Sequence, residues 1–536
     1  MADFIYKYAG GDLSSPRFQA LYNDKLDIAA YLRVFYNQET ITHVKTEEGS
    51  ITILGYAFHM KVETKSYLTD LLHGFTEKII PEIKKNLLGQ YIAIIHKKNV
   101  LYIFSDFLQV RSIYYSAAAK VISSSYDVSN EQAPSPVDLY KGFEYAAMRH
   151  CMYPAWLGNS TMNSGLLKLR GFEYLKIECS SGVITVCDFK FTIRNIQEPS
   201  LSRITQQTLD TLRTAIRHPQ LKEQKIASNI TGGFDSRLVT ALVKEYYTNV
   251  NLRISVYKGE TSLDYTIAQK MSKVFSTPLT VYETDKQTQT AWFYSVVEGL
   301  APTENAIITN LLQHTQCYKL GFGGAFGTEL YTLPTYTTTE ELFADYLRKA
   351  RQFIQADEPY FERFEQALRD EYNDIKAHYC LAQKDERCWM RIMRMVNTAY
   401  FSSPFVSAFN IYGNQFEIFG TFPIIELGLQ IPYKYFGSST TFGRFYLIPK
   451  NMMEQVNRKA SSMDTNHFCP MRPLSIYSFF AYFAGRFRRK RYYAQMAKKQ
   501  VNQPFNIKIE DKGGRWTYTS NGWIEAFWIK FLRVNS

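Results

Sequence analysis

The chain has 536 residues, of which 46% are hydrophobic and 21% charged, and its formal net charge is +12. The length exceeds what one hydrophobic core usually supports, so we expect more than one globular domain. The positive charge makes polyanions the partners to consider, namely ATP, nucleic acid, anionic lipid or an acidic glycan. Neither a zinc finger nor an aromatic and basic ribonucleoprotein signature is present, so we expect no nucleic-acid partner.

The seven cysteines are odd in number and include no CxxC pair. This argues against a disulfide framework or a structural zinc site and favours a reducing compartment. The N-terminus lacks the basic and apolar regions of a signal peptide. The longest apolar run, 476–484, is too short to span a bilayer. We therefore expect a cytoplasmic protein.

The first 195 residues are predicted to form mainly strands. β-Branched and aromatic residues bounded by turn residues indicate strands at 50–54, 91–96, 100–104 and 182–187. A helical stretch at 66–85 separates the first two. The natural domain boundary is 195–202, which contains Gln-Glu-Pro-Ser.

The pattern then changes to alternating strands and helices. Strands are predicted at 225–230, 252–256 and 279–281, and helices at 236–247 and 265–275. This alternation predicts a doubly wound parallel sheet. Beyond Thr335 the chain is expected to be mostly helical, with 343–380 as the longest stretch.

The segment with the clearest chemistry is Thr231-Gly232-Gly233-Phe234-Asp235-Ser236, between a predicted strand and a predicted helix. Two glycines let the backbone approach a ligand closely, and the N–H groups of a helix start favour an anion. Asp235 would repel a bare phosphate, which suggests a bridging Mg²⁺. The loop matches neither GxxxxGK[ST] nor GxGxxG. The plainer alternative is a glycine turn whose Asp or Ser caps the helix.

This loop resembles the SGGxDS loop of the family that contains asparagine synthetases, β-lactam synthetases and lasso-peptide cyclases. Three later segments resemble the same family in the expected order: Ser262-Leu263-Asp264; Gly324-Ala325-Phe326-Gly327-Thr328-Glu329, which is similar to GEGSDE; and Pro432-Tyr433-Lys434 followed by Gly443-Arg444. The N-terminal half is similar too, since residues 105–115 align without gaps to the family's RDPFGVKPLYY, and 89–91, 121–125 and 158–175 resemble its neighbouring segments.

The resemblance implies a two-domain α/β protein. Residues 1–195 would be a degenerate glutamine amidotransferase-like domain with an Ntn-hydrolase-like α+β sandwich. Residues 200–536 would be an asparagine synthetase-like ATP-pyrophosphatase domain, a PP-loop (adenine nucleotide α-hydrolase-like) doubly wound parallel sheet with added helices.

Four departures from the family pattern bear on the reaction. Ala2 stands where glutamine-using members have the catalytic Cys, so we expect no glutaminase activity. Ala325 replaces a Glu that handles the incoming amine, and Thr328 replaces a Mg²⁺-binding Asp. Arg444 replaces a Lys, but Arg also binds phosphate.

The implied activity is an AMP-forming carbon–nitrogen ligase that uses ATP and Mg²⁺. It would adenylate a small-molecule or peptide carboxylate and transfer it to ammonia or an amine. Peptide or β-lactam cyclisation is the favoured setting; amidation of a sugar acid or amino acid in glycan biosynthesis, and a nucleotide-binding pseudoenzyme, are the alternatives. Whether the chain forms a homodimer is left open.

The resemblance also assigns residues to roles. Asp235 and Glu329 would hold the metal, and Arg444, with Lys434 or Lys450 as lesser candidates, would stabilise the developing charge. The residues expected at the nucleotide are Ile230, Thr231, Gly232, Gly233, Asp235, Ser236, Val256, Tyr257, Gly323 and Gly324.

The sharpest basic cluster, 485–493, follows the apolar run. Peripheral docking to a membrane surface or a glycan is one interpretation of this segment. A solvated basic helix end is the other.

Overall fold

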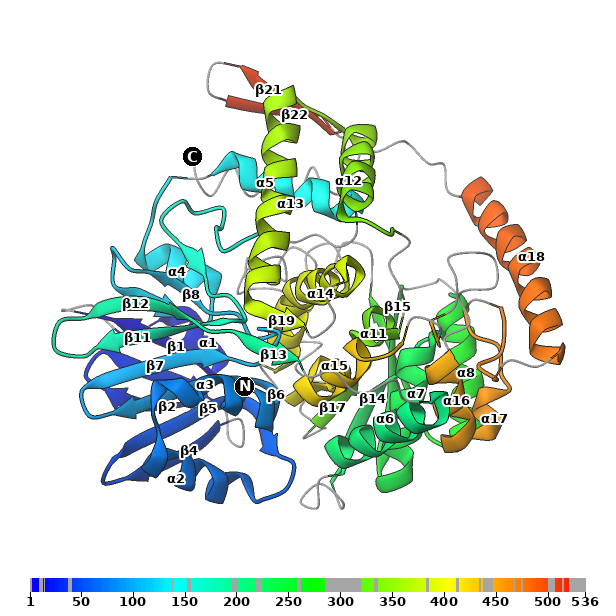
Figure 1. The fold of residues 1–536 in the computed structure, drawn as a ribbon, viewed down its shortest axis with the longest axis horizontal. Helices are drawn as coiled ribbons and strands as arrows, with labels where there is room; N and C mark the ends of the chain where they lie inside the picture. The colour runs from blue at the N-terminus through cyan, green and yellow to red at the C-terminus, as the bar shows by residue number, and fades with distance from the viewer. Residues whose placement is uncertain are drawn as a thin grey trace.

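The computed structural model describes residues 2–8, 13, 15–36, 41–136, 138–151, 156–193, 200–217, 224–257, 262–284, 320–331, 336–381, 385–410, 414–432, 435–436, 447–466, 468–473, 476–499, 507–512 and 515–519. The first part of the chain forms two six-stranded antiparallel sheets that face each other (Figure 1). One sheet has the order β10-β8-β9-β1-β3-β2, made of β1 (Ala2–Lys7), β2 (Asp24–Ala29), β3 (Leu32–Tyr36), β8 (Tyr114–Ser116), β9 (Val121–Ser123) and β10 (Leu167–Lys168). The other has the order β12-β11-β7-β6-β5-β4, made of β4 (Ile41–Thr46), β5 (Gly49–His59), β6 (Leu87–Lys97), β7 (Val100–Ser105), β11 (Glu173–Glu178) and β12 (Val183–Asp188).

The two sheets and the helices that cover their outer faces form four layers, with an apolar core between each pair of neighbouring layers. The central core lies between the sheets and includes Phe4 and Val34 from one and Ile94 and Ile103 from the other. The helices α1 (Pro16–Leu21) and α4 (Tyr126–Gln132) cover the outer face of the first sheet. The helices α2 (Thr64–Gly74) and α3 (Ile80–Asn86) cover the outer face of the second.

The predicted N-terminal strands are found within β5, β6, β7 and β12. The single helix predicted at 66–85 is wrong, because the chain forms α2, the short 3-10 helix η1 (Glu77–Ile79) and α3 instead. Phe75 is extended at the end of α2, with φ −63° and ψ 125°. Pro81 is then the second residue of α3, in the first turn, where its missing N–H costs no helical hydrogen bond.

The second part is built on a five-stranded parallel sheet with the order β16-β15-β14-β17-β20. In chain order its strands are β14 (Ile226–Asn229), β15 (Val250–Tyr257), β16 (Leu279–Thr284), β17 (Leu320–Gly323) and β20 (Asn414–Glu417). The helices α6 (Leu201–Ile216), α7 (Phe234–Tyr246) and α8 (Leu263–Phe275) accompany it. The chain builds outward from β14 through β15 to β16, and then returns to β17 on the other side of β14. The predicted doubly wound parallel sheet is confirmed, and the division at 195–200 stays a prediction.

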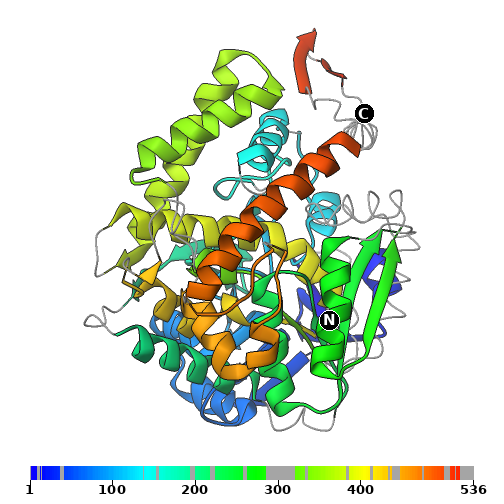
Figure 2. The same ribbon diagram turned by 90° about the vertical axis from the view of Figure 1, so that its right-hand side faces the viewer.

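Beyond Thr335 the described chain is mostly helical, as predicted, and further helices are described outside these sheets. They are α5 (Leu139–Cys151), α11 (Gly327–Tyr331), α12 (Thr339–Phe353), α13 (Glu358–His378), α14 (Glu386–Asn410), α15 (Phe422–Leu429), α16 (Leu447–Val456), α17 (Arg458–Ser461) and α18 (Ile476–Lys499). Two small sheets join distant segments: β13 (Phe191–Ile193) pairs with β19 (Tyr379–Leu381), and β18 (Ile354–Gln355) pairs with the hairpin of β21 (Ile507–Lys512) and β22 (Arg515–Thr519). Figure 2 shows α12 and α5 side by side at the top of the molecule.

The prediction that 343–380 is the longest helical stretch is wrong. The segment Ile354–Gln355 is a strand, and α13 starts afresh with Pro359 in its first turn. Among the described helices, α14 is the longest with 25 residues. No helix in the described ranges combines the length and apolar content that crossing a bilayer requires.

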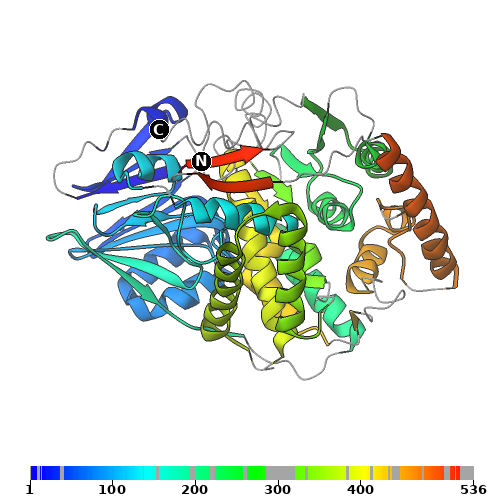
Figure 3. The same cartoon turned by 90° about the horizontal axis from the view of Figure 1, so that it is seen from above.

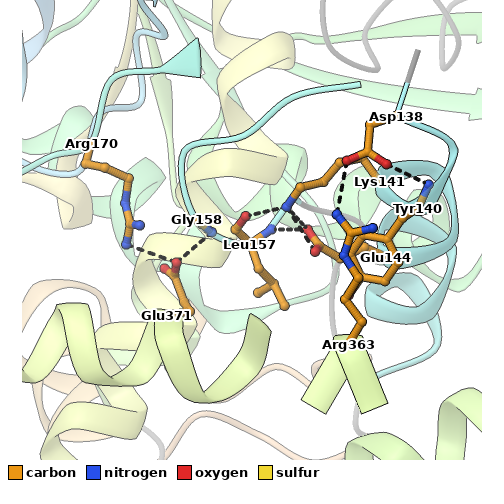
Figure 4. Close-up of polar contacts among 9 residues, drawn as sticks. All are labelled: Asp138, Tyr140, Lys141, Glu144, Leu157, Gly158, Arg170, Arg363 and Glu371. Carbon is orange, nitrogen blue, oxygen red and sulfur yellow. Dashed lines mark hydrogen bonds and ion pairs between the residues drawn. The ribbon is translucent and has the colours of Figure 1, made fainter. Parts of the chain in front are cut away.

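Two buried carboxylates bind successive backbone amides where α5 and α13 meet the loop that follows α5 (Figure 4). Glu144 accepts from Leu157 N at 2.6 Å and pairs with Lys141 at 2.9 Å. Glu371 accepts from Gly158 N at 2.8 Å and pairs with Arg170 at 2.9 Å. Burial raises the pKa of Glu144, and the Lys141 ammonium opposes that rise. These contacts fix α13 to the end of the sandwich through buried charge rather than apolar packing alone.

We expect Glu371→Ala to lower the free energy of unfolding by about 3–5 kcal/mol, because it removes the buried charge partner of Arg170 and leaves only the exposed Asp374 carboxylate, 3.3 Å away. Replacing both partners, by Arg170→Met with Glu371→Leu, should lower the free energy of unfolding much less, because no buried charge is left unpaired. Glu340→Ala, which breaks the exposed pair with Arg369, should change the denaturation midpoint little. Chemical denaturation of the three variants measures this, and equal losses in all of them would contradict it.

Candidate active site

The glycine loop lies where the strand order of the parallel sheet reverses. Thr231, Gly232 and Gly233 follow β14 directly, and Gly324 follows the neighbouring strand β17. The chain leads from β14 through α7 to β15 on one side of the sheet, whereas the strand beside β17 on the other side is β20, so the connections after β14 and β17 diverge. The carboxyl ends of the strands at such a reversal of strand order are where open α/β sheets bind ligands.

Gly232 is held by two residues that are distant in the sequence. Its N–H donates to Asp264 Oδ1 at 2.9 Å, and its carbonyl accepts from Asn466 N at 2.8 Å. Asn466 Nδ2 also donates to Asp264 Oδ1, at 3.3 Å. A Cβ on Gly232 would lie 2.5 Å from Asp264 Oδ1 and 2.9 Å from Ile267 Cδ1, so no larger residue fits.

The remaining loop contacts are local. Thr231 N donates to Ser236 Oγ at 3.1 Å, and the two hydroxyl oxygens lie 2.9 Å apart. Gly233 N donates to Thr231 Oγ1 at 3.3 Å, and Gly233 is the N-cap of α7. A Cβ on Gly233 would meet only Thr231 Oγ1, at 3.4 Å, which is an ordinary contact. The packing therefore favours a glycine at position 232 and leaves room for a side chain at 233.

The turn after β17 packs against the start of α7. A Cβ on Gly324 would lie 2.9 Å from Ser236 N, and one on Gly327 would lie 2.4 Å from Asp235 Oδ1. The first and third resemblance motifs, 90 positions apart, thus meet at the Asp235 carboxylate. Within the described ranges, no three His, Cys, Asp or Glu side chains gather to form a metal site.

Arg237, directly after the loop serine, neither faces the loop nor lies along the helix surface. It is fully buried and donates to the carbonyls of Ala460, Met463 and Asp464, at 3.3, 2.7 and 2.8 Å. Burial lowers the pKa of Arg237 to about 10, and Asp464 partly offsets the shift. Arg237 therefore fixes the segment that leads to Asn466.

A carboxylate from the last strand reaches the turn after β17. Glu417 Oε2 accepts from Ala325 N at 2.8 Å, and its Oε1 accepts from Gln415 Nε2 at 2.9 Å. Arg253 on β15 donates to Gln415 Oε1 at 2.8 Å, passing over Gly321. Burial raises the pKa of Glu417. Sequence reasoning missed this group because nothing near Glu417 resembles a motif.

Of the other predicted site residues, some lie within the described ranges and some do not. Ile230 and Val256 are buried at the carboxyl ends of their strands, and Ile230 N donates to the Arg253 carbonyl at 3.0 Å. Lys450 on α16 is buried, which lowers its pKa. The side chains of Tyr257 and Glu329, and the whole of Lys434 and Arg444, lie outside the described residues. The binding roles assigned to all these residues stay predictions.

No family model and no curated protein sequence matches the chain. Among solved structures, it is similar to NMN synthetase from Francisella tularensis over 38% of this chain and 97% of that one, at 11% identity and TM-score 0.21. It is similar to the glutamine phosphoribosylpyrophosphate amidotransferase from B. subtilis over 52% of this chain and 90% of that one, at 10% identity and TM-score 0.23. It is also similar to glutamine-dependent NAD+ synthetase from Acinetobacter baumannii over 50% of this chain and 66% of that one, at 12% identity and TM-score 0.19. Similarities this weak assign neither fold nor activity.

The two loop glycines provide a matched pair of substitutions. Gly232→Ala should lower the free energy of unfolding by about 1–3 kcal/mol, because its Cβ would overlap Asp264 and Ile267. Gly233→Ala should unfold at the temperature of the wild type. Thermal denaturation followed by circular dichroism compares them, and equal destabilisation of both variants would refute the loop geometry.

Proposed function

We propose that the chain is an ATP-dependent, AMP-forming carbon–nitrogen ligase. It adenylates the carboxylate of a small molecule or peptide and transfers the acyl group to ammonia or to an amine of the substrate. The observation that carries the proposal is the position of the Thr231–Ser236 loop at the strand-order reversal, directly before the N-terminus of α7.

The loop has the chemistry to hold the pyrophosphate that leaves during adenylation. Gly233 gives the backbone close access, the hydroxyls of Thr231 and Ser236 face each other, and the dipole of α7 favours an anion. Magnesium ions in such sites need only one or two protein carboxylates in addition to the phosphates. Asp235, at the meeting point of the two turns, fits that requirement.

Catalysis in this scheme is mainly positioning and electrostatic stabilisation. The substrate carboxylate attacks the α-phosphorus of ATP, which forms an acyl-adenylate and releases pyrophosphate. An amine then attacks the acyl carbon and AMP leaves. We propose that Glu417 accepts the proton of this amine, because its carboxylate reaches Ala325 and its raised pKa suits a general base.

The N-terminal part is proposed to be an Ntn-like sandwich that has lost glutaminase activity. Position 2, at the start of β1, is Ala2 and carries no nucleophile. The first thiol in the chain, Cys151, donates to the Tyr346 carbonyl at 3.3 Å. Burial raises the pKa of Cys151 to about 12, so this thiol stays protonated near neutral pH.

Adenylation is tested by ATP–pyrophosphate exchange across a panel of carboxylates. Asp235→Asn should slow exchange about a hundredfold, on the scale of losing one electrostatic stabiliser. Gly233→Ala should abolish exchange without loss of fold. Asp70→Asn, an exposed change of the same charge on α2, should have no effect. Wild-type rates in both loop variants would show that the loop is not the site, and silence of the wild type would favour the pseudoenzyme.

Glu417→Gln should separate the two half-reactions. Pyrophosphate exchange should continue, because the loop is untouched, while amide formation should fall about 100-fold or more, which is the scale of general-base catalysis. Chromatography of AMP and amide product measures the second step. Equal loss of both steps would indicate a structural role for Glu417.

The nitrogen source provides a separate test. The protein should form amide with ammonium chloride or an amine and none with glutamine, because no nucleophile occupies position 2. Glutamate release from glutamine by the purified protein is the measurement. Release above background, undiminished in the Cys151→Ala variant, would overturn the assignment of the sandwich.

A further inference from the structure

The helix α18 lies along the outer edge of the molecule, on the side away from the sandwich (Figures 1 and 3). Figure 2 shows it crossing the face of the molecule obliquely. Its 24 residues contain seven basic and no acidic side chains. Such a helix has a strongly positive field that no residue of its own offsets.

The solvent-facing side of α18 is apolar along its centre. Phe480 is 65% exposed and Phe487 is 72% exposed, and these two lie seven positions apart, so they share one face. Ala484, between them on that face, is exposed, and Phe483 beside it is half-buried. Contiguous exposed apolar surface rimmed by polar residues is typical of protein or membrane interaction sites.

Basic side chains flank this apolar stripe on both sides. Arg486 and Lys490 lie to one side, and Arg488 and Arg491 lie toward the other, and all four are exposed. The opposite side of the helix faces the protein: Gly485 is buried, and Tyr492 packs on Phe468 with ring centroids 5.5 Å apart.

Polar contacts of Arg488 add to this packing and hold the helix in its orientation. Arg488 pairs with Asp464 at 3.2 Å and donates to the Phe468 carbonyl at 3.0 Å. These partners lie in the segment that Arg237 fixes. The exposed phenylalanines are therefore presented by an anchored helix.

We propose that α18 docks the protein onto an anionic lipid bilayer. An apolar centre with cationic flanks is the arrangement by which a helix lies in the plane of a membrane interface, with apolar side chains among the acyl chains and basic ones at the headgroups. Single-stranded nucleic acid also attracts aromatic and basic residues, but it is bound in grooves that follow its backbone. The exposed side of α18 is a convex, solitary helix. This surface does not depend on the proposed ligase activity.

The test is flotation of the full chain with vesicles of phosphatidylcholine, with and without phosphatidylserine. The wild type should float only with the anionic vesicles, and salt should weaken the binding. Changing Phe480 and Phe487 to Ser should weaken binding at least about tenfold through the lost apolar contact. Changing Arg486, Lys490 and Arg491 to Gln should weaken it about a hundredfold.

Two control variants separate docking from general surface effects. Val183→Ser with Val186→Ser removes exposed apolar side chains on β12, and Gln at Lys61, Lys65 and Lys270 removes the same charge elsewhere. Both should bind as the wild type does. Equal loss in these controls, no binding to anionic vesicles, or binding that RNA abolishes would overturn the proposal. So would a dimer in light scattering that the phenylalanine changes dissociate, because the stripe would then face a second copy.

Discussion

The arrangement of the candidate site depends on the contact between the turn after β17 and the start of α7. Two parallel strands are adjacent in the sheet, and the segments that follow them must pass each other closely before they diverge. Gly324 and Gly327 make this possible, because any Cβ there would overlap the backbone of residues 235–236 or the Asp235 carboxylate. A side chain at either glycine would force α7 away from β17.

A second constraint acts on the loop from the C-terminal part of the chain. Arg237 binds three carbonyl groups between residues 460 and 464, and the same segment then places Asn466 against Gly232 and Asp264. The loop geometry is therefore determined by α7, α8 and a segment more than 200 positions later. An anion that binds this loop meets a rigid surface, which lowers the entropy lost on binding.

The sequence predicted the features that have local signatures. The spacing of apolar residues predicted β14, β15 and α7, and the paired glycines predicted the turn between β14 and α7. It failed where a proline or an extended residue interrupts a helical pattern, as at Phe75 and Pro359, since such breaks are settled by packing. The roles of Arg237 and Asn466 could not be predicted, because their partners are brought together only by tertiary structure. Glu417 was missed for the same reason: its carboxylate matters only because β20 lies beside β17.

The side chain of Gln90 completes the parallel sheet in a way that binds the two halves of the chain together. Its amide donates to the Glu417 carbonyl at 3.1 Å and accepts from Glu417 N at 2.8 Å, as a neighbouring strand would. Since β20 is the last strand in the described order, this N–H and this carbonyl lie at the edge of the sheet. Left unpaired, they could form hydrogen bonds with a strand of another molecule. Tyr56 and Phe58 cover the same strand by packing on Phe416. The sandwich thus covers the edge of the parallel sheet, and a chain that lost it would expose a strand edge able to pair with other molecules.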